Sequence, residues 1–313
     1  MRFARLALLG ALAPFLIRCG GDDPGASGDG GAQGADAPTA TATATATATG
    51  TGTAPGDDGG SGLPTTTPGC GVAAKPSPAA GDKKTVDVGA AKRSYVLYVP
   101  AGYDPSRAYP VVFVFHGIGA NGTQMSQFVK MQDYSAGNAI VVFPDGAGGR
   151  WDIEGEQDLL FFDAMQKSLG ATLCVNPQRV FALGFSYGAY MTNHLGCRRS
   201  SAVRAIVAAD GGFADKESGC GKTSALVYHR REDDDEPVAN GVAARDKWIA
   251  INGCSKASKP VTQWGLDAKG CVAYDGCPGA APVLWCEDTA TSPYKHDLRD
   301  VYRVPMWKWM EHF

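Results

Sequence analysis

The chain has 313 residues and a formal net charge of −3, and charged residues make up 19% of it. The charges form no basic stripe, which excludes nucleic acid as an expected partner. Beyond the N-terminus, no apolar run is long enough to cross a membrane as a helix.

Residues 1–19 have the form of a secretory signal. Two arginines precede a short apolar run at residues 6–17, which is too short to span a bilayer permanently. Leu16 and Cys19 also fit a bacterial lipoprotein signal, in which the cysteine becomes lipidated, although Arg18 stands where that signal has a small residue. We therefore expect export to the cell envelope or beyond. A lipid on Cys19 would be the chain's only membrane attachment.

Residues 20–69 read as a linker. They are rich in Gly, Ala, Asp, Thr and Pro and lack the large apolar residues that nucleate a core. We expect a flexible tether here, followed by one domain over residues 70–313 that acts as a monomer.

The domain alternates apolar runs with stretches of helical spacing. Predicted strands cover residues 94–99, 111–115, 139–143, 179–185, 205–209, 224–228 and 282–286. Predicted helices cover residues 158–169, 187–195, 240–252 and 304–313. Strands that are apolar throughout predict a mostly parallel sheet with helices on both faces, an α/β fold. Ligands of such sheets bind at the carboxyl ends of the strands.

Apart from Cys19, eight cysteines remain, an even number that favours disulfides in an exported chain. A zinc site is the weaker alternative, because no Cys-x-x-Cys pair occurs. The spacing leaves the pairing open, but the crowding from Cys254 onward predicts stapled C-terminal loops. The eight are Cys70, Cys174, Cys197, Cys220, Cys254, Cys271, Cys277 and Cys286.

The motif Gly184-Phe185-Ser186-Tyr187-Gly188 follows one of the predicted strands and precedes a predicted helix. This is the form of a nucleophile elbow, in which a sharp turn holds one serine at its apex. The glycines at both ends are needed because side chains there would clash across the turn. Ser186 is therefore the candidate nucleophile.

A serine hydroxyl needs a base within hydrogen-bond reach, and that base needs an orienting carboxylate. In the order serine, acid, histidine, the base is His296 in a loop after the last strand, and His312 near the chain end is expected at the surface. The acid is Asp233, with Asp234 and Asp235 left as alternatives.

Three further histidines are set aside. His194 follows the serine on the same helix and is expected to pack or cap, and His229 precedes the acidic run. His116 lies before a glycine in the loop after a buried strand, where we expect a structural hydrogen-bonding role.

Two backbone N–H groups are the candidate oxyanion donors. The residue after the nucleophile supplies one, here Tyr187. The second is expected from the loop His116-Gly117-Ile118-Gly119, with Ile118 as the donor.

Further motifs make the sequence resemble secreted esterases of the feruloyl esterase and polyhydroxybutyrate depolymerase type, related to carbohydrate esterase family 1. They lie between Cys70 and Phe313, and comprise Tyr109-Pro110 before His116-Gly117, Phe143-Pro144-Asp145-Gly146 with Trp151-Asp152, Asp158 to Asp163, Cys174 to Val180, Ala239-Asn240-Gly241, Asn252-Gly253-Cys254 and Val283 to Glu287.

The resemblance implies an α/β-hydrolase fold, no cofactor or metal, and a triad of Ser186, Asp233 and His296. The chain departs from relatives, which read His-Gly where it has His229-Arg230 and place a Gly-His pair earlier than His296. We expect a serine carboxylic-ester hydrolase that forms an acyl-enzyme on a polymeric or aryl ester. Feruloyl esters on plant polysaccharide are the first choice, polyhydroxybutyrate the second and acetyl xylan the third. A non-catalytic surface binding protein that kept the fold is the alternative from another class.

Overall fold

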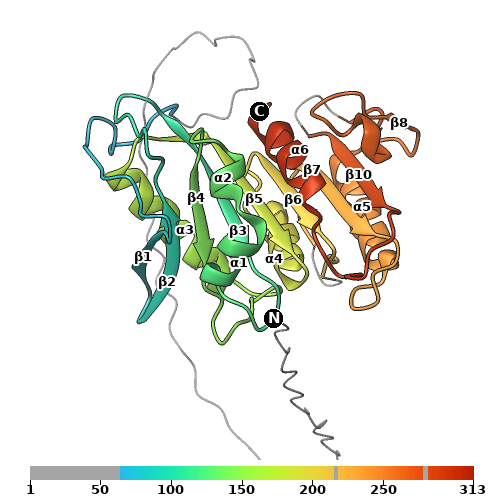
Figure 1. Cartoon of the computed structure of the whole chain (residues 1–313), viewed down its shortest axis with the longest axis horizontal. Coiled ribbons are helices and arrows are strands. Elements are labelled where there is room, and N and C mark those ends of the chain that lie inside the picture. The colour runs from blue at the N-terminus through green and yellow to red at the C-terminus, as the bar shows by residue number, and fades with distance from the viewer. Residues whose placement is uncertain (1–63, 215–217, 278–280) are drawn as a thin grey trace, which may run out of the picture. The chain divides into compact units, whose positions relative to one another are not determined.

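A ten-stranded sheet runs through the described part of the chain (Figure 1). The computed structural model describes residues 64–214, 218–277 and 281–313. The chain divides into two units, Met1–Asp57 and Asp58–Phe313, and all described residues belong to the second. The predicted signal at residues 1–19, including Cys19, and most of the predicted linker lie outside the described residues.

The sheet order is β1-β2-β4-β3-β5-β6-β7-β10-β9-β8. The six strands from β4 to β10 in this order are mutually parallel, while β1, β2, β9 and β8 pair antiparallel at the two edges. The strands are β1 (Asp82–Val88), β2 (Ala91–Tyr98), β3 (Tyr109–Phe115), β4 (Ile140–Pro144), β5 (Val175–Phe185), β6 (Ala205–Ala209), β7 (Ser224–Arg230), β8 (Ser258–Pro260), β9 (Cys271–Tyr274) and β10 (Val283–Asp288).

Helices cover both faces of this sheet. They are α1 (Gly122–Val129), α2 (Met131–Tyr134), α3 (Gln157–Thr172), α4 (Tyr187–Arg198), α5 (Val238–Asn252) and α6 (Asp300–Glu311), with a 3-10 turn at Asp267–Lys269. The mostly parallel, doubly covered α/β sheet that the sequence predicts is confirmed.

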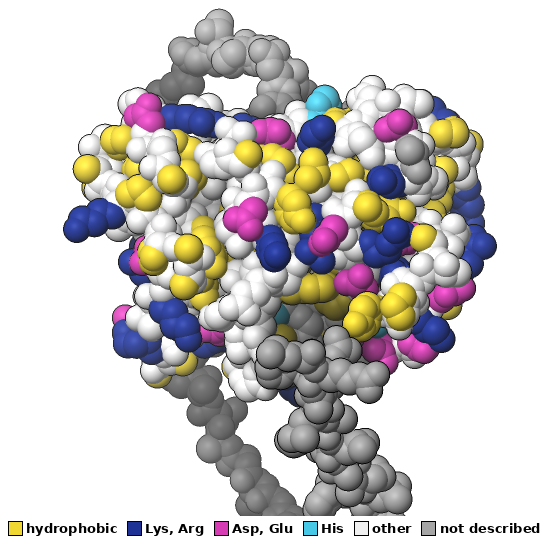
Figure 2. Space-filling view, viewed as in Figure 1, with side chains coloured by type: hydrophobic (Ala, Val, Ile, Leu, Met, Phe, Trp, Pro, Cys, Tyr) yellow, Lys and Arg dark blue, Asp and Glu magenta, His cyan; other side chains and the backbone are white. Residues whose placement is uncertain are grey.

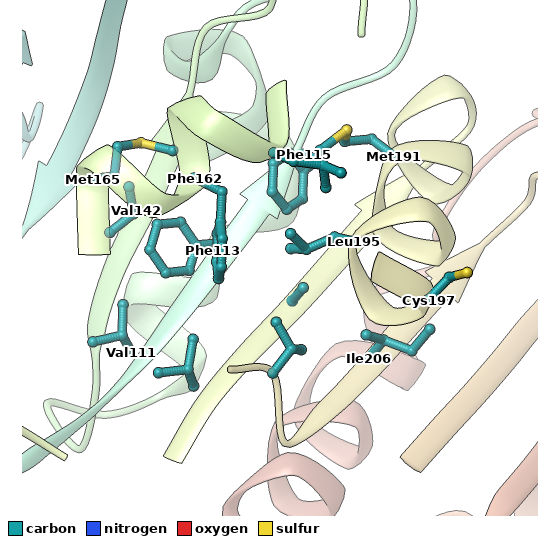
Figure 3. Close-up of a cluster of buried hydrophobic side chains, with 14 of the residues drawn as sticks. Val111, Phe113, Phe115, Val142, Phe162, Met165, Met191, Leu195, Cys197 and Ile206 are labelled. Carbon is teal, nitrogen blue, oxygen red and sulfur yellow. The ribbon is translucent and has the colours of Figure 1, made fainter. Parts of the chain in front are cut away.

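Strand β3 shows why the central strands are apolar at every position. Its odd-numbered residues Val111, Phe113 and Phe115 pack on one face with residues of α3, α4 and α5, as Figure 3 shows for α3 and α4. Its even-numbered residues Val112 and Val114 pack on the other face with residues of α1, α2 and α6. Successive side chains of a strand point to opposite faces, so a strand covered on both sides cannot alternate apolar with polar residues.

The predicted elements match the observed ones within a few residues, and the largest differences are the early starts of β5 and α6. Strand β5 begins at Val175, four residues before the predicted start at Arg179. We predicted a start at Val304, whereas α6 begins at Asp300 and contains Pro305 as its sixth residue. Proline is most favourable in the first turn of a helix, and a start at Val304 would put Pro305 there. The predicted start is therefore four residues too late. Pro305 is one of the buried residues of α6, so its burial offsets the missing hydrogen bond.

Three strands, β1, β8 and β9, and two short helices, α1 and α2, were not predicted, because the strands lack a continuous apolar run and the helices are only eight and four residues long. Strand β1 reads Asp-Lys-Lys-Thr-Val-Asp-Val and forms a charged sheet edge, which protects against pairing with other chains. The short strands β8 and β9 extend the opposite edge, and α1 follows the loop after β3.

All eight domain cysteines form disulfides, as predicted, and two of the bridges staple the C-terminal region. The pairs are Cys70–Cys174, Cys197–Cys220, Cys254–Cys277 and Cys271–Cys286. The chain that precedes Cys70 also contacts the domain, because Thr67 Oγ1 donates to Leu173 O and Gly69 N donates to Gly170 O.

None of the described helices is long and apolar enough to cross a membrane. On the face shown in Figure 2, lysine and arginine side chains are interspersed with aspartate and glutamate. No strip of a single charge covers this face.

Candidate active site

Ser186 occupies a sharp turn between β5 and α4. Its backbone has φ of 58° and ψ of −125°, a conformation that residues other than glycine rarely adopt and that persists only where the surroundings impose it. The surroundings here include Gly184 and Gly188. A Cβ at Gly184 would lie 2.0 Å from the Gly188 carbonyl oxygen, and a Cβ at Gly188 would lie 2.1 Å from the Phe115 carbonyl oxygen. The backbone therefore has the geometry that the Gly-x-Ser-x-Gly motif predicts.

His296 and Asp233, which are 63 residues apart in the sequence, form a direct hydrogen bond. The His296 Nδ1 atom lies 2.7 Å from Asp233 Oδ2, and the Asp233 side chain is fully buried. The other carboxylate oxygen, Oδ1, accepts the backbone N–H groups of Asp235 at 3.0 Å and Glu236 at 2.8 Å. This carboxylate thus orients the imidazole and also holds the loop that follows β7.

The neighbouring candidates for the acid lie differently. The carboxylate of Asp234 is exposed and pairs with Lys295 Nζ at 3.1 Å. That contact is the main reason why the pKa of Asp234 is lowered. Asp235 is exposed and lines the cleft described next. Of the three aspartates in the run, Asp233 is the one bonded to His296.

Ser186 and His296 line the same cleft, whose volume is about 650 Å³. One wall comes from the loop after β3 and from α1, and the other comes from the loop after β7. The lining residues are Gly117, Ile118, Ala120, Gln124, Met125, Phe128, Phe185, Ser186, Asp235, Glu236 and His296. A cleft of this size accommodates a small aryl ester.

Aromatic rings form much of the apolar side of the cleft. The Phe128 and Phe185 rings have centroids 5.0 Å apart, and the Phe185 ring lies 4.6 Å from the His296 imidazole. The histidine is therefore held by a carboxylate at one nitrogen and by an aromatic ring against its side.

The two predicted oxyanion donors lie at the expected places in the chain. Tyr187 is the first residue of α4, directly after the serine. In the loop after β3, the amides of Gly119 and Ala120 donate to Gly149 O and Gly117 O. Within residues 64–214, 218–277 and 281–313, no hydrogen bond from the Ile118 amide is seen.

His116 holds the loop together, as expected. It is buried, its Nδ1 lies 2.7 Å from Gly117 O, and its Nε2 accepts the Gly146 N–H at 2.9 Å. The Trp151 ring packs on it with centroids 4.5 Å apart, and burial lowers its pKa. A neutral imidazole with both nitrogens engaged is suited to a structural role.

Each of the other three histidines contacts a partner other than Ser186. His194 bonds through Nε2 to Gly155 O at 2.7 Å, and His229 bonds through Nε2 to Glu236 O at 2.8 Å. His312 is exposed in the last turn of the chain and contacts Trp264. These placements agree with the packing and surface positions expected of His194 and His312.

Asp210, at the end of β6, is a buried acid that the sequence reasoning missed. Its Oδ1 accepts the Arg230 N–H at 2.7 Å, and its Oδ2 has no hydrogen-bond partner among the described residues. Burial raises its pKa well above the usual value, and the nearby Asp233 carboxylate adds to the rise. Its position one residue past an apolar strand, at the edge that carries Ser186 and Asp233, was the available signal.

Asp210, His229 and Asp233 each offer one potential metal-ligating atom within 4.8 Å of the others. Both oxygens of Asp233 already accept hydrogen bonds from His296, Asp235 and Glu236, so a metal there would compete with the orientation of the imidazole. The arrangement is better suited to acid–base work than to metal binding.

A serine at an elbow and a carboxylate-bound histidine on one cleft define the chain as an ester hydrolase of the α/β-hydrolase fold. Solved structures of the same fold include an acetyl xylan esterase from Aspergillus awamori, with a TM-score of 0.57 and 14% identity over 74% of this chain and 100% of that one. They also include the feruloyl esterase module from Clostridium thermocellum complexed with sinapinate, with a TM-score of 0.51 and 17% identity over 77% of this chain and 94% of that one.

Relatives found by sequence similarity identify the family within this class of ester hydrolases. A probable feruloyl esterase C from Aspergillus terreus is 32% identical over 213 residues, which are 61% of this chain and 78% of that protein. Feruloyl esterase C from Emericella nidulans is 31% identical over 232 residues, which are 66% of this chain and 85% of that protein. No protein-family model matches the sequence. The chain belongs to the feruloyl esterase family.

Proposed function

We propose that the chain hydrolyses esters of hydroxycinnamic acids by an acyl-enzyme mechanism, with Ser186 as nucleophile, His296 as base and Asp233 as the orienting acid. The observation that carries this proposal is the hydrogen bond between His296 Nδ1 and Asp233 Oδ2, on an imidazole that lines the same cleft as Ser186.

The Asp233 carboxylate accepts the Nδ1 proton of His296 and leaves Nε2 unprotonated, so Nε2 takes the hydroxyl proton as Ser186 Oγ attacks the ester carbonyl. The carbonyl oxygen becomes an oxyanion, which the N–H groups of Tyr187 and Ile118 stabilise. When the intermediate collapses, the imidazolium gives its proton to the departing alcohol. A water molecule, deprotonated by His296, then attacks the acyl-enzyme. The imidazolium returns this proton to Ser186 Oγ as the acid is released.

The walls of the cleft support an aromatic acyl group. Phe128 and Phe185 offer two ring faces, and Met125 adds a polarisable thioether that also favours aromatic contacts. The names of the curated relatives point to the feruloyl group among such acids. A polymeric alcohol, plant polysaccharide, fits a chain that is exported on a tether.

Export by the segment 1–19, a lipid on Cys19, a tether over residues 20–69 and a monomeric domain over residues 70–313 remain part of the proposal. The four disulfides support export, because such bonds persist in oxidising compartments. Mass spectrometry of the purified protein from its native membrane fraction would detect the lipid.

The proposal is tested with the purified domain, methyl ferulate and a fluorophosphonate probe. We expect release of ferulate and covalent labelling of Ser186, both lost in Ser186→Ala. If the probe labels Ser186 but methyl ferulate is not hydrolysed, the substrate class is wrong. Rapid turnover of short hydroxyalkanoate oligomers or of acetyl xylan would then name the substrate. Absence of both labelling and turnover would favour the non-catalytic binding protein.

A further inference from the structure

The cleft has walls of different character on the two sides of Ser186. In the sheet order, β3 lies on one side of β5, and β7 lies beyond β6 on the other. The loop after β3, helix α1 and Phe185 at the end of β5 supply the apolar residues, while the loop after β7 supplies Asp235 and Glu236. An acyl group packed on the aromatic side therefore leaves the alcohol half of the ester facing the two carboxylates.

The backbone of both acidic residues is held by hydrogen bonds, and so is the Glu236 carboxylate. Their backbone N–H groups donate to Asp233 Oδ1, the carboxylate that also orients His296. The Glu236 carboxylate also accepts bonds from Tyr190 Oη at 3.2 Å and from Asn240 Nδ2 at 2.9 Å. The Glu236 carboxylate therefore keeps a constant position relative to the reacting ester, and the backbone of Asp235 is fixed beside it.

The described residues that line the cleft include no lysine or arginine that could offset these charges. Lys295, next to His296, pairs with Asp234 at 3.1 Å, and Arg303, whose guanidinium lies 4.9 Å from the Phe128 ring, pairs with Asp300 at 2.6 Å.

We propose that Asp235 and Glu236 select the alcohol half of the substrate by charge, so that esters of neutral sugars are hydrolysed in preference to esters of uronic acids and other anionic alcohols. This inference rests on the proposed function and names the substrate class within it. Two negative charges close to the ester repel a carboxylate on the alcohol. A neutral hydroxylated ring is not repelled and can donate hydrogen bonds to the same oxygens.

A matched pair of substrates tests the proposal: carboxymethyl ferulate, whose alcohol half is anionic, and carbamoylmethyl ferulate, its neutral isostere. The measured quantity is kcat/KM of the anionic ester divided by that of the neutral ester. The intrinsic reactivities of the two esters cancel when this ratio is compared between variants. The variants are Asp235→Asn, Glu236→Gln and the double variant, with Glu232→Gln as control, because it removes the same charge from the same acidic run at a residue outside the cleft.

At low ionic strength we expect each cleft substitution to raise the ratio about five- to tenfold, as for unit charges several ångströms apart in a partly solvated site. The double variant should raise it more, and the Glu232→Gln control should stay within about twofold of wild type. In 1 M salt, where the Debye length is about 3 Å, the wild-type ratio should rise towards that of the double variant.

An equal ratio in wild type and all variants, at both ionic strengths, would overturn the inference while leaving the proposed function in place. If the double variant is unstable, the ratios of the two single variants and the salt dependence of the wild-type ratio test the inference by the same criterion. If the wild-type enzyme hydrolyses neither of the two esters, the proposed function is wrong, and the inference is wrong with it.

Discussion

Substitution of Asp233 by asparagine probes the proposed triad with the least structural disturbance. The side chain is fully buried and makes three hydrogen bonds, one to His296 and two to backbone N–H groups of its own loop. In Asp233→Asn the amide oxygen can keep the two backbone bonds at the Oδ1 position. The NH₂ group then replaces Oδ2 and faces His296 Nδ1.

An NH₂ group can only donate, so Nδ1 must become the acceptor and the imidazole proton must move to Nε2. The nitrogen that should receive the Ser186 proton is then already protonated. We expect kcat to fall by about 10⁴-fold, the loss seen for the equivalent substitution in serine protease triads. The loss of unfolding free energy should be only about 1–2 kcal/mol, because the three hydrogen bonds are kept and lose only their charge assistance.

The assay is steady-state hydrolysis of methyl ferulate, with thermal unfolding measured on the same preparations. Asp234→Asn is the matched control. It makes the same chemical change one residue away, at an exposed carboxylate that pairs with Lys295 instead of His296. We expect that control to keep wild-type kcat within about threefold. If Asp233→Asn retains more than a tenth of wild-type kcat, or if the two variants lose activity equally, the assignment of Asp233 is wrong.

Three further outcomes are expected. Ser186→Ala should abolish turnover while shifting the Tm by less than about 2 °C, since the Cβ is kept, and a large fall in the Tm would mean that the residue is structural. Gly188→Ala should lower the unfolding free energy by about 1–3 kcal/mol or more, because its Cβ would lie 2.1 Å from the Phe115 carbonyl oxygen; a wild-type denaturation midpoint would contradict this. The folded-state pKa of Asp210 is raised, so its contribution to stability is full below the unfolded pKa and is lost as the pH rises through the folded value. Asp210→Asn, which can still accept the Arg230 N–H, should therefore raise the Tm more at pH 8 than at pH 4, and an equal change at both pH values would refute this.

Much of the fold could be predicted because its signals are local. The runs that became β3, β4, β6 and the second half of β5, residues 180–185, are apolar at nearly every position, which only a strand covered on both faces requires. The edge strand β1 gave no such signal, because a charged edge resembles a polar loop in sequence. The start of α6 was misplaced because a proline inside a helix is rare, and only the fold shows that Pro305 is buried there.

The sequence by itself determined the elbow at Ser186, since two glycines around a serine answer a steric requirement within five residues. It also determined that the cysteines would pair, although their partners depended on the fold. Only the tertiary structure decided which of three adjacent aspartates meets His296, and that the aromatic and acidic walls face the same cleft. These are contacts between residues tens of positions apart, and their distances depend on how the strands pack side by side rather than on any local pattern.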